Sequence, residues 1–163
     1  MTFVLIPGAG GEAWYWHRLV AELERRGHDA VAVDLPAGDD GAGWAEYAAA
    51  VVAAAEGRVA GDGIDVMVDF FHDVPDDVTA EAMDRGDPAQ SMTPFTQPFP
   101  LDRWPDVPTR VLAGRDDRLF PLEFQRRVAR ERLGLPTDEI PGGHLVALSR
   151  PVELAERLAA YAA

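Results

Sequence analysis

The chain has 163 residues, of which 47% are hydrophobic and 26% charged, as is typical of one globular domain spanning residues 1–163. The net charge of −13 argues against nucleic acid and anionic membranes as partners, and the absence of cysteine and lysine excludes disulfides, thiolate metal sites and Schiff-base chemistry. No apolar run approaches the roughly 18 residues of a membrane span and no secretory signal follows Met1, so we expect a cytoplasmic protein.

The start of the sequence predicts a strand, a helix and a second strand. Residues 3–6 form a short apolar run that ends at the glycine-rich turn 7–11. Apolar positions recur at helical spacing over residues 14–26, and residues 30–33 form the second strand. Strand, helix and strand within so few residues predict a right-handed crossover and a parallel sheet.

The glycine-rich turn has two interpretations. Structurally, glycine lets a helix pack closely on the strand that precedes it. Functionally, its exposed backbone N–H groups are suited to binding a developing oxyanion, because no side chain blocks the approach. The turn is not a dinucleotide fingerprint, since Ala13 stands where G-x-G-x-x-G requires its third glycine. We therefore expect no nucleotide cofactor.

The middle of the chain predicts a cover over the rest. An alanine-rich helix is predicted over residues 44–56, and the β-branched and aromatic run 64–71 favours a strand. Residues 75–86 predict a short acidic helix, and residues 87–108 contain six prolines, which is typical of irregular structure. Segment 64–108 is accordingly predicted to be a cap.

The last third predicts strands over residues 109–113 and 137–140, with helices over 124–133 and 151–161. Ligands of open parallel sheets bind outside the carboxyl ends of the strands. Gly8, Asp117 and His144 would all lie at such ends.

Several motifs at these ends resemble those of the α/β-hydrolase family, in its small esterase-like form. They are P-G-A-G at residues 7–10, G-R-D-D-R-L-F-P at 114–121, G-G-H at 142–144 and S-R-P at 149–151. The resemblance covers residues 3–56 and about 65–161. It implies an α/β fold with a hydrolase-like parallel sheet flanked by helices.

The resemblance also implies the roles of individual residues. Asp117 corresponds to the catalytic acid and His144 to the base, while the backbone N–H groups of Ala9 and Gly10 correspond to the oxyanion-binding loop. The implied partner is a small apolar acyl or ester-like molecule. Three aromatic residues would line its cleft, or belong to the ordinary core instead: Trp14, Phe70 and Phe71.

The chain departs from the family where the nucleophile is expected. No G-x-S-x-G occurs, and the family order of nucleophile, acid and histidine would place one after residues 44–56, where only the glycine-rich stretch 57–63 stands. A strand, elbow, helix and further strand, roughly 40 residues, are absent, so the sheet is predicted to be truncated in its centre. An internally deleted version of a longer hydrolase, natural or engineered, is one explanation.

No other residue replaces the nucleophile convincingly. Asp62 between two glycines is similar to the aspartate nucleophile of dehalogenase-like relatives, but it lacks the flanking strand and helix. Ser149 is interpreted as a helix cap and Ser91 as a solvated loop residue. His72 and Asp73, with neighbouring acids, favour an acidic surface over a metal site, and no metal or other cofactor is expected.

Two functions therefore stay open. Asp117 and His144 could activate a water for weak ester hydrolysis. Alternatively, the protein is a noncatalytic small-molecule-binding or interaction protein on a hydrolase scaffold. Loss of central strands also exposes sheet edges, which predicts a homodimer, a domain swap, or a rearranged sheet in which residues 64–71 fill part of the gap.

Overall fold

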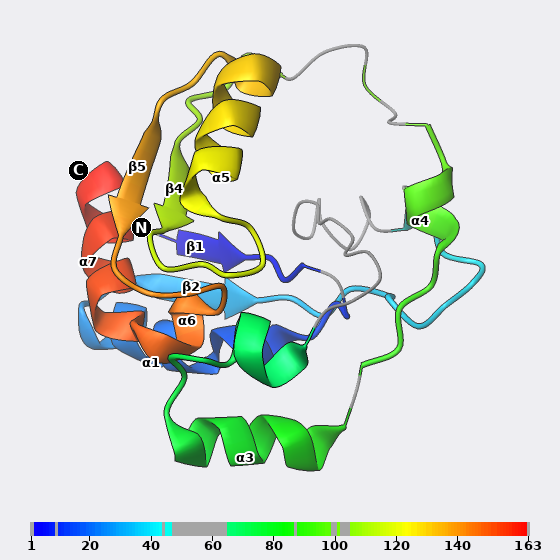
Figure 1. Cartoon of the computed structure of the whole chain (residues 1–163), viewed down its shortest axis with the longest axis horizontal. Coiled ribbons are helices and arrows are strands. Elements are labelled where there is room, and N and C mark those ends of the chain that lie inside the picture. Colours follow the sequence, from blue (N-terminus) through cyan, green and yellow to red (C-terminus); the bar gives the residue numbers. More distant parts are fainter. Residues whose placement is uncertain are drawn as a thin grey trace.

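The computed structural model describes residues 2–8, 10–43, 45–46, 65–86, 88–98, 101 and 105–162. Its strands form two parallel pairs (Figure 1). β1 (Thr2–Leu5) pairs with β2 (Asp29–Ala32), and β4 (Val111–Gly114) pairs with β5 (Thr137–Ile140). No hydrogen bonding joins the two pairs within these ranges. The fold is α/β, with parallel strands flanked by helices, as predicted.

The first crossover unit confirms the predicted strand, helix and strand. A 3-10 turn, η1 (Ala13–Trp16), leads into α1 (His17–Arg25), and Gly27 follows with a φ of 81°. Leu19 and Leu23 lie one helical turn apart on α1 and are fully buried. Complete burial of each leucine side chain is worth about 1.5–3 kcal/mol, so this face of α1 fixes the helix against the strands.

The prediction of a strand over residues 64–71 is wrong, because this segment forms a π-helical turn, η2 (Val66–Phe70). Asp65 explains the difference. Its Oδ1 accepts hydrogen bonds from the backbone N–H groups of Met67 and Val68, while its own N–H donates to Asp69 Oδ2. These local bonds offer the backbone an alternative to a strand ladder and override the β propensity of the side chains. The segment therefore does not fill the gap between the strand pairs.

The rest of the predicted cap contains two helices at the periphery in Figure 1. α3 (Asp76–Arg85) confirms the predicted acidic helix, and α4 (Thr93–Thr96) is a single turn in the proline-rich segment. Most of the helix predicted over residues 44–56, the stretch 57–63 and Asp62 lie outside the described residues.

The C-terminal part follows the predicted order closely. α5 (Leu122–Val128) continues into a π-helical turn, η3 (Ala129–Leu133), and Gly134 ends it in the left-handed conformation that glycine favours. α7 (Pro151–Tyr161) coincides with the predicted last helix. Only the short α6 (Val146–Ser149) was not predicted.

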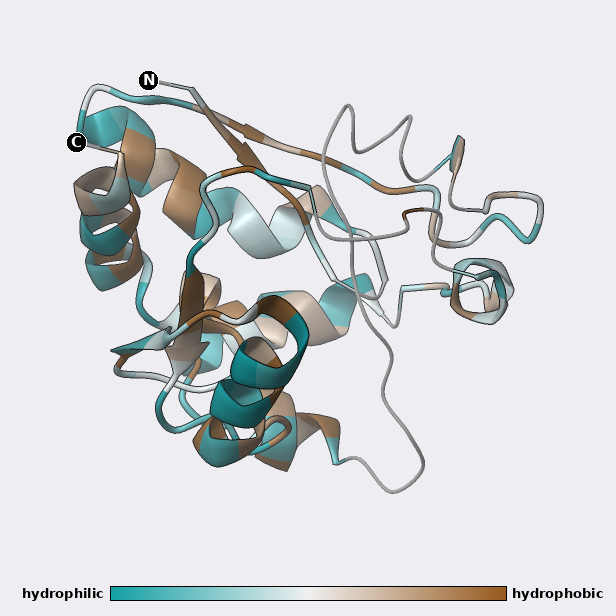
Figure 2. Ribbon diagram, turned by 90° about the horizontal axis from the view of Figure 1, so that it is seen from above, coloured by the Kyte–Doolittle hydropathy of each residue, from teal (hydrophilic) through white to brown (hydrophobic). Residues whose placement is uncertain are grey.

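The main core lies between the strands, α1 and α7. Figure 2 shows brown stretches along the strands, whereas the helices carry both brown and teal residues. Buried residues of this core come from both strand pairs and three helices: Leu5, Leu19, Leu23, Ile140, Ala147, Leu154 and Ala155. No helix among the described residues has the length and apolar character needed to cross a membrane.

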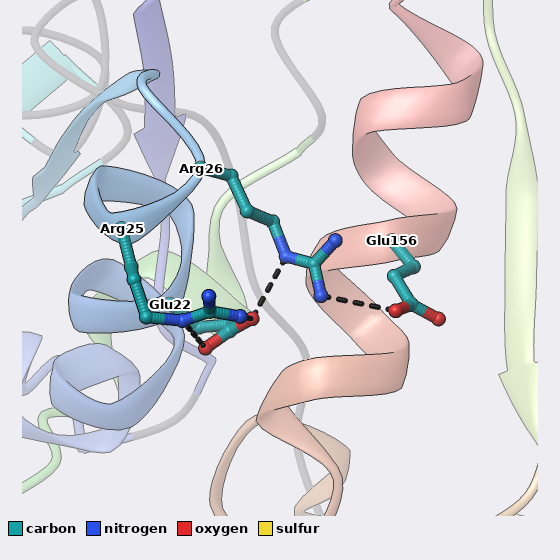
Figure 3. A network of polar contacts seen from close by, with 4 residues as sticks. All are labelled: Glu22, Arg25, Arg26 and Glu156. Carbon is teal, nitrogen blue, oxygen red and sulfur yellow. Dashed lines mark hydrogen bonds and ion pairs between the residues drawn. The ribbon is translucent and has the colours of Figure 1, made fainter.

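An ionic network joins α1 to α7 beside this core (Figure 3). Glu22 accepts hydrogen bonds from Arg25 and Arg26, and Arg26 also binds Glu156 of α7 at 3.0 Å. The Arg25 hydrogen bond is the largest of the effects that lower the pKa of Glu22 to about 2, and Arg26 adds to it. Glu22 therefore stays ionised at neutral pH although it is buried.

Candidate active site

Asp117 lies in the loop after β4, where it is held in one orientation. Its Oδ1 accepts a hydrogen bond from the backbone N–H of Phe120 at 2.9 Å, and its Oδ2 accepts one from Gln125 Nε2 at 3.2 Å. Gln125 also donates to the Phe120 carbonyl at 2.6 Å, which ties the loop to the start of α5. The Asp117 side chain is only 6% exposed, so its carboxylate is directed inward with most of its acceptor sites used.

His144 lies in the loop after β5 and meets Asp117, as the sequence predicted. Its Nδ1 is 3.1 Å from Asp117 Oδ2, and its side chain is 23% exposed. An ionised carboxylate only accepts hydrogen bonds, so Nδ1 of the neutral ring carries the proton and Nε2 carries the lone pair. Within the described part of the chain, no group hydrogen-bonds Nε2. A buried carboxylate thus orients the imidazole ring of His144 through Nδ1.

The turn before His144 is fastened to the loop before Asp117. The backbone N–H of Asp116 donates to the Gly142 carbonyl at 3.0 Å, and Asp116 Oδ2 accepts the N–H of Gly142 at 3.1 Å. Arg115 adds a backbone bond to the Ile140 carbonyl at 2.8 Å. These bonds continue the β4–β5 ladder beyond the strands and bring the two loops together, as Figure 1 shows for the segments that leave β4 and β5.

Two aromatic rings flank His144. The Phe70 ring of η2 lies 4.8 Å from the imidazole at 78°, and the Phe120 ring lies 5.4 Å away at 65°, both in edge-to-face geometry. Phe71 is instead 6% exposed in a second core cluster with Val74 and Leu148. Trp14 packs against the same cluster, and its Nε1 donates to Glu81 at 2.8 Å. Of the three predicted lining residues, Phe70 is thus the one that contacts His144.

The predicted oxyanion loop is described only in part. Ala9 lies outside the described residues. Gly10 has a φ of 86°, and its N–H donates to Gln90 Oε1 at 2.8 Å. An oxyanion role for Gly10 stays a prediction and requires the Gln90 amide to release this N–H. Pro88 also closes over the turn, because a Cβ on Gly10 would lie 2.6 Å from Pro88 Cγ.

Neither serine occupies the expected surroundings. Ser91 is buried rather than solvated, at 5% exposure, because its N–H donates to the Ala37 carbonyl and its Oγ accepts the N–H of Thr93. Ser149 does not cap α7. The N-cap residue of this helix is Arg150, and its side chain makes no capping hydrogen bond. Ser149 Oγ is buried and has no hydrogen-bond partner in the described ranges. Neither residue is placed by any described contact against His144.

Sequence reasoning missed three residues that hold the Asp117–His144 pair. Phe120 lies inside the G-R-D-D-R-L-F-P motif that contains Asp117. Its position in that motif, just before Pro121, was the signal that could have indicated its contact with Asp117. Gln125 and Asp73 gave no signal, because their roles depend on contacts across the fold. Asp73, which was assigned to an acidic surface, accepts the backbone N–H of Gly143 at 2.8 Å. Within the described residues, no three histidine or acidic side chains gather as a metal site.

Comparison with known proteins agrees with the α/β fold. The model of the Alpha/beta hydrolase family matches residues 55–157, and no curated protein matches the chain. The structure is similar to a methylesterase from Arabidopsis, with a TM-score of 0.79 and 16% identity over 99% of this chain and 98% of that one. It is also similar to a pyrethroid hydrolase from Sphingobium faniae JZ-2, with a TM-score of 0.72 and 19% identity over 99% and 97%. At such identities these likenesses show the fold alone.

Proposed function

Because the chain belongs to the alpha/beta hydrolase family, we propose that it is a hydrolase-fold protein in which Asp117 and His144 act on carboxylic esters or similar acyl compounds through water, with weak turnover. The observation that carries the proposal is the 3.1 Å contact between His144 Nδ1 and Asp117 Oδ2. It directs the lone pair of Nε2 away from the acid. The esterase and pyrethroid hydrolase relatives support the choice of acyl compounds as substrates.

The proposed reaction begins with a water that donates a hydrogen bond to His144 Nε2. As the water oxygen attacks the ester carbonyl carbon, Nε2 takes its proton and the carbonyl oxygen becomes an oxyanion. Asp117 stabilises the imidazolium that forms. The tetrahedral intermediate then breaks its bond to the alkoxide, which takes the proton back from Nε2. The products are a carboxylic acid and an alcohol, and the histidine returns to its neutral form.

The expected rate is low because the chain has no G-x-S-x-G elbow. General-base catalysis by a positioned histidine contributes about 10²- to 10⁴-fold. A complete serine triad adds a covalent intermediate, and enzymes that lose a triad member retain only about 10³- to 10⁴-fold over water. The elbow residue also supplies one oxyanion N–H in this family, and loss of such a donor costs roughly another 10²-fold. We explain the missing elbow by an internal deletion relative to a longer hydrolase.

Residues 64–108 are proposed to cap the site. This segment reaches both candidate loops: Phe70 contacts the His144 ring, Asp73 binds Gly143, and Gln90 binds Gly10. A substrate at Nε2 would therefore lie beneath residues of this segment, of which η2 presents the exposed apolar side chains Val66, Met67 and Val68.

The test is turnover of short acyl esters by the purified chain, with its intact mass measured on the same sample. His144→Ala should abolish the turnover above the background rate. His17→Ala is the matched control, because His17 is exposed on α1 and its Nδ1 bonds only locally, to the Trp14 carbonyl. A fluorophosphonate probe should leave the mass unchanged. Stoichiometric labelling would show a serine nucleophile and overturn the water mechanism.

Ligand binding without catalysis is the second candidate function. It is favoured by the missing nucleophile and by the rings of Phe70 and Phe120, which pack against His144. Calorimetric titration with the same esters and their carboxylic acid products separates the two functions. Saturable binding with equal turnover in the chain and in His144→Ala would support a binding protein. Absence of binding would count against it.

A further inference from the structure

The turn before His144 is held by carboxylates from two distant segments. Gly142 and Gly143 are successive residues, and each donates its backbone N–H to a different acid. Asp116, 26 positions earlier, receives the N–H of Gly142 at 3.1 Å, and Asp73, 70 positions earlier, receives that of Gly143 at 2.8 Å. Asp116 belongs to the same loop as Asp117, whereas Asp73 comes from the segment between η2 and α3.

The Asp73 carboxylate reaches this turn in a tightly packed and buried place. Both glycines are buried. A Cβ on Gly143 would lie 2.5 Å from His72 Nε2 and 2.7 Å from Asp73 Oδ1, so only glycine leaves room for these two side chains. Asp73 Oδ1 is itself buried and has no hydrogen bond in the described ranges. The bond from Gly143 to Asp73 Oδ2 is part-buried and charge-assisted, and charge-assisted hydrogen bonds are stronger than neutral ones.

The same segment also touches the imidazole ring. Phe70 packs edge-to-face on His144 at 4.8 Å, and Asp73 follows it by three positions. Residues 70–73 thus contact both the ring and the backbone immediately before it. The turn has little freedom to move while these contacts persist, because Asp116 holds its other N–H.

We propose that Asp73 is a positioning residue for His144: its carboxylate fixes the Gly142–Gly143 turn and so keeps His144 Nδ1 within hydrogen-bond distance of Asp117 Oδ2. Asp73 acts through the loop, because its Oδ2 binds the backbone N–H of Gly143, the residue before His144. The catalytic meaning of this role rests on the proposed function, whereas the geometric role does not.

The experiment compares Asp73→Ala and Asp73→Asn with the unaltered chain by nuclear magnetic resonance. Two signals are followed, the exchange rate of the Gly143 N–H and the ¹⁵N shifts of the His144 ring, which report which nitrogen carries the proton. Asp77→Ala is the matched control, because it removes the same charge from an exposed position of α3. Circular dichroism shows which variants fold.

In Asp73→Ala we expect the Gly143 N–H to exchange at least about tenfold faster, since hydrogen bonds to charged groups are among the stronger ones. The His144 ring should change from the Nδ1-protonated form to a mixture of tautomers, because its hydrogen bond to Asp117 selects that form. Asp73→Asn keeps an acceptor oxygen and should give an intermediate result. Asp77→Ala should leave both signals unchanged.

Unchanged signals in a folded Asp73→Ala would overturn the proposal. Should that variant not fold, Asp73→Asn decides: a faster Gly143 exchange with a tautomer change supports positioning, and the absence of both refutes it. Ester turnover is measured separately. A chain that shows these spectral changes but hydrolyses no ester would retain the positioning role of Asp73 and lose the proposed hydrolytic function.

Discussion

Gly114→Ala tests whether close backbone packing builds the site. Gly114 is the last residue of β4 and lies opposite Ile140 of β5. A Cβ at position 114 would lie 2.5 Å from the Gly143 carbonyl oxygen and 2.8 Å from that of Gly142. Both obstacles are backbone atoms of the turn that precedes His144, so no side-chain rotation relieves the clash.

The magnitude follows from these distances. Carbon and carbonyl oxygen normally touch at about 3.3 Å, so the turn must move by most of an ångström or the strands must separate. Overpacking of this kind costs about 1–3 kcal/mol. A typical urea m-value of about 2 kcal/mol per M converts this into a midpoint lower by about 0.5–1.5 M.

Gly8→Ala is the matched control, because a Cβ at position 8 meets no atom of the described residues within 4 Å. Neither glycine has a positive φ, so alanine fits the backbone at both positions. Each substitution therefore also stabilises the fold by about 0.4–1 kcal/mol, because alanine reduces the conformational entropy of the unfolded chain. Urea unfolding of both variants isolates the packing cost as the difference between them. Equal midpoints for Gly114→Ala and Gly8→Ala would refute the reasoning.

Two further predictions concern charge and assembly. The pKa of Glu22 is lowered to about 2 in the fold, so its contribution to stability is present above its ordinary pKa of 4.5 and is lost as the pH falls towards 2. The stability difference between the unaltered chain and Glu22→Gln, measured by urea unfolding, should therefore shrink between about pH 5 and pH 2, and a difference independent of pH would contradict the network in Figure 3. Within the described residues each sheet has two strands, whose outer edges have no strand partner, so light scattering should give a dimer whose fraction rises with concentration. A strictly monomeric chain at all concentrations would argue against edge pairing.

Local patterns determined much of the fold because they act over short distances. Helical spacing and end signals predicted α7 and the strand–helix–strand unit at the start of the chain. The G-x-x-D-x-x-x-P and G-G-H motifs predicted Asp117 and His144, whose contact needs only two neighbouring parallel strands with loops at the same end. The missing elbow was also visible in the sequence, since it requires a fixed pattern of glycines around a serine.

Tertiary contacts decided the remainder. Residues 64–71 have the composition of a strand, yet local hydrogen bonds of Asp65 turn them into η2. The tertiary fold then places Phe70 of η2 against the imidazole of His144. Asp73 is one of several acids in an acidic segment, and only the folded chain shows which of them receives the N–H of Gly143. The sequence by itself thus determined which two side chains, Asp117 and His144, meet in the loops after β4 and β5. Only the tertiary structure decided how the turn before His144 is held, because Asp73 and Gly143 are 70 residues apart and no local pattern encodes their approach.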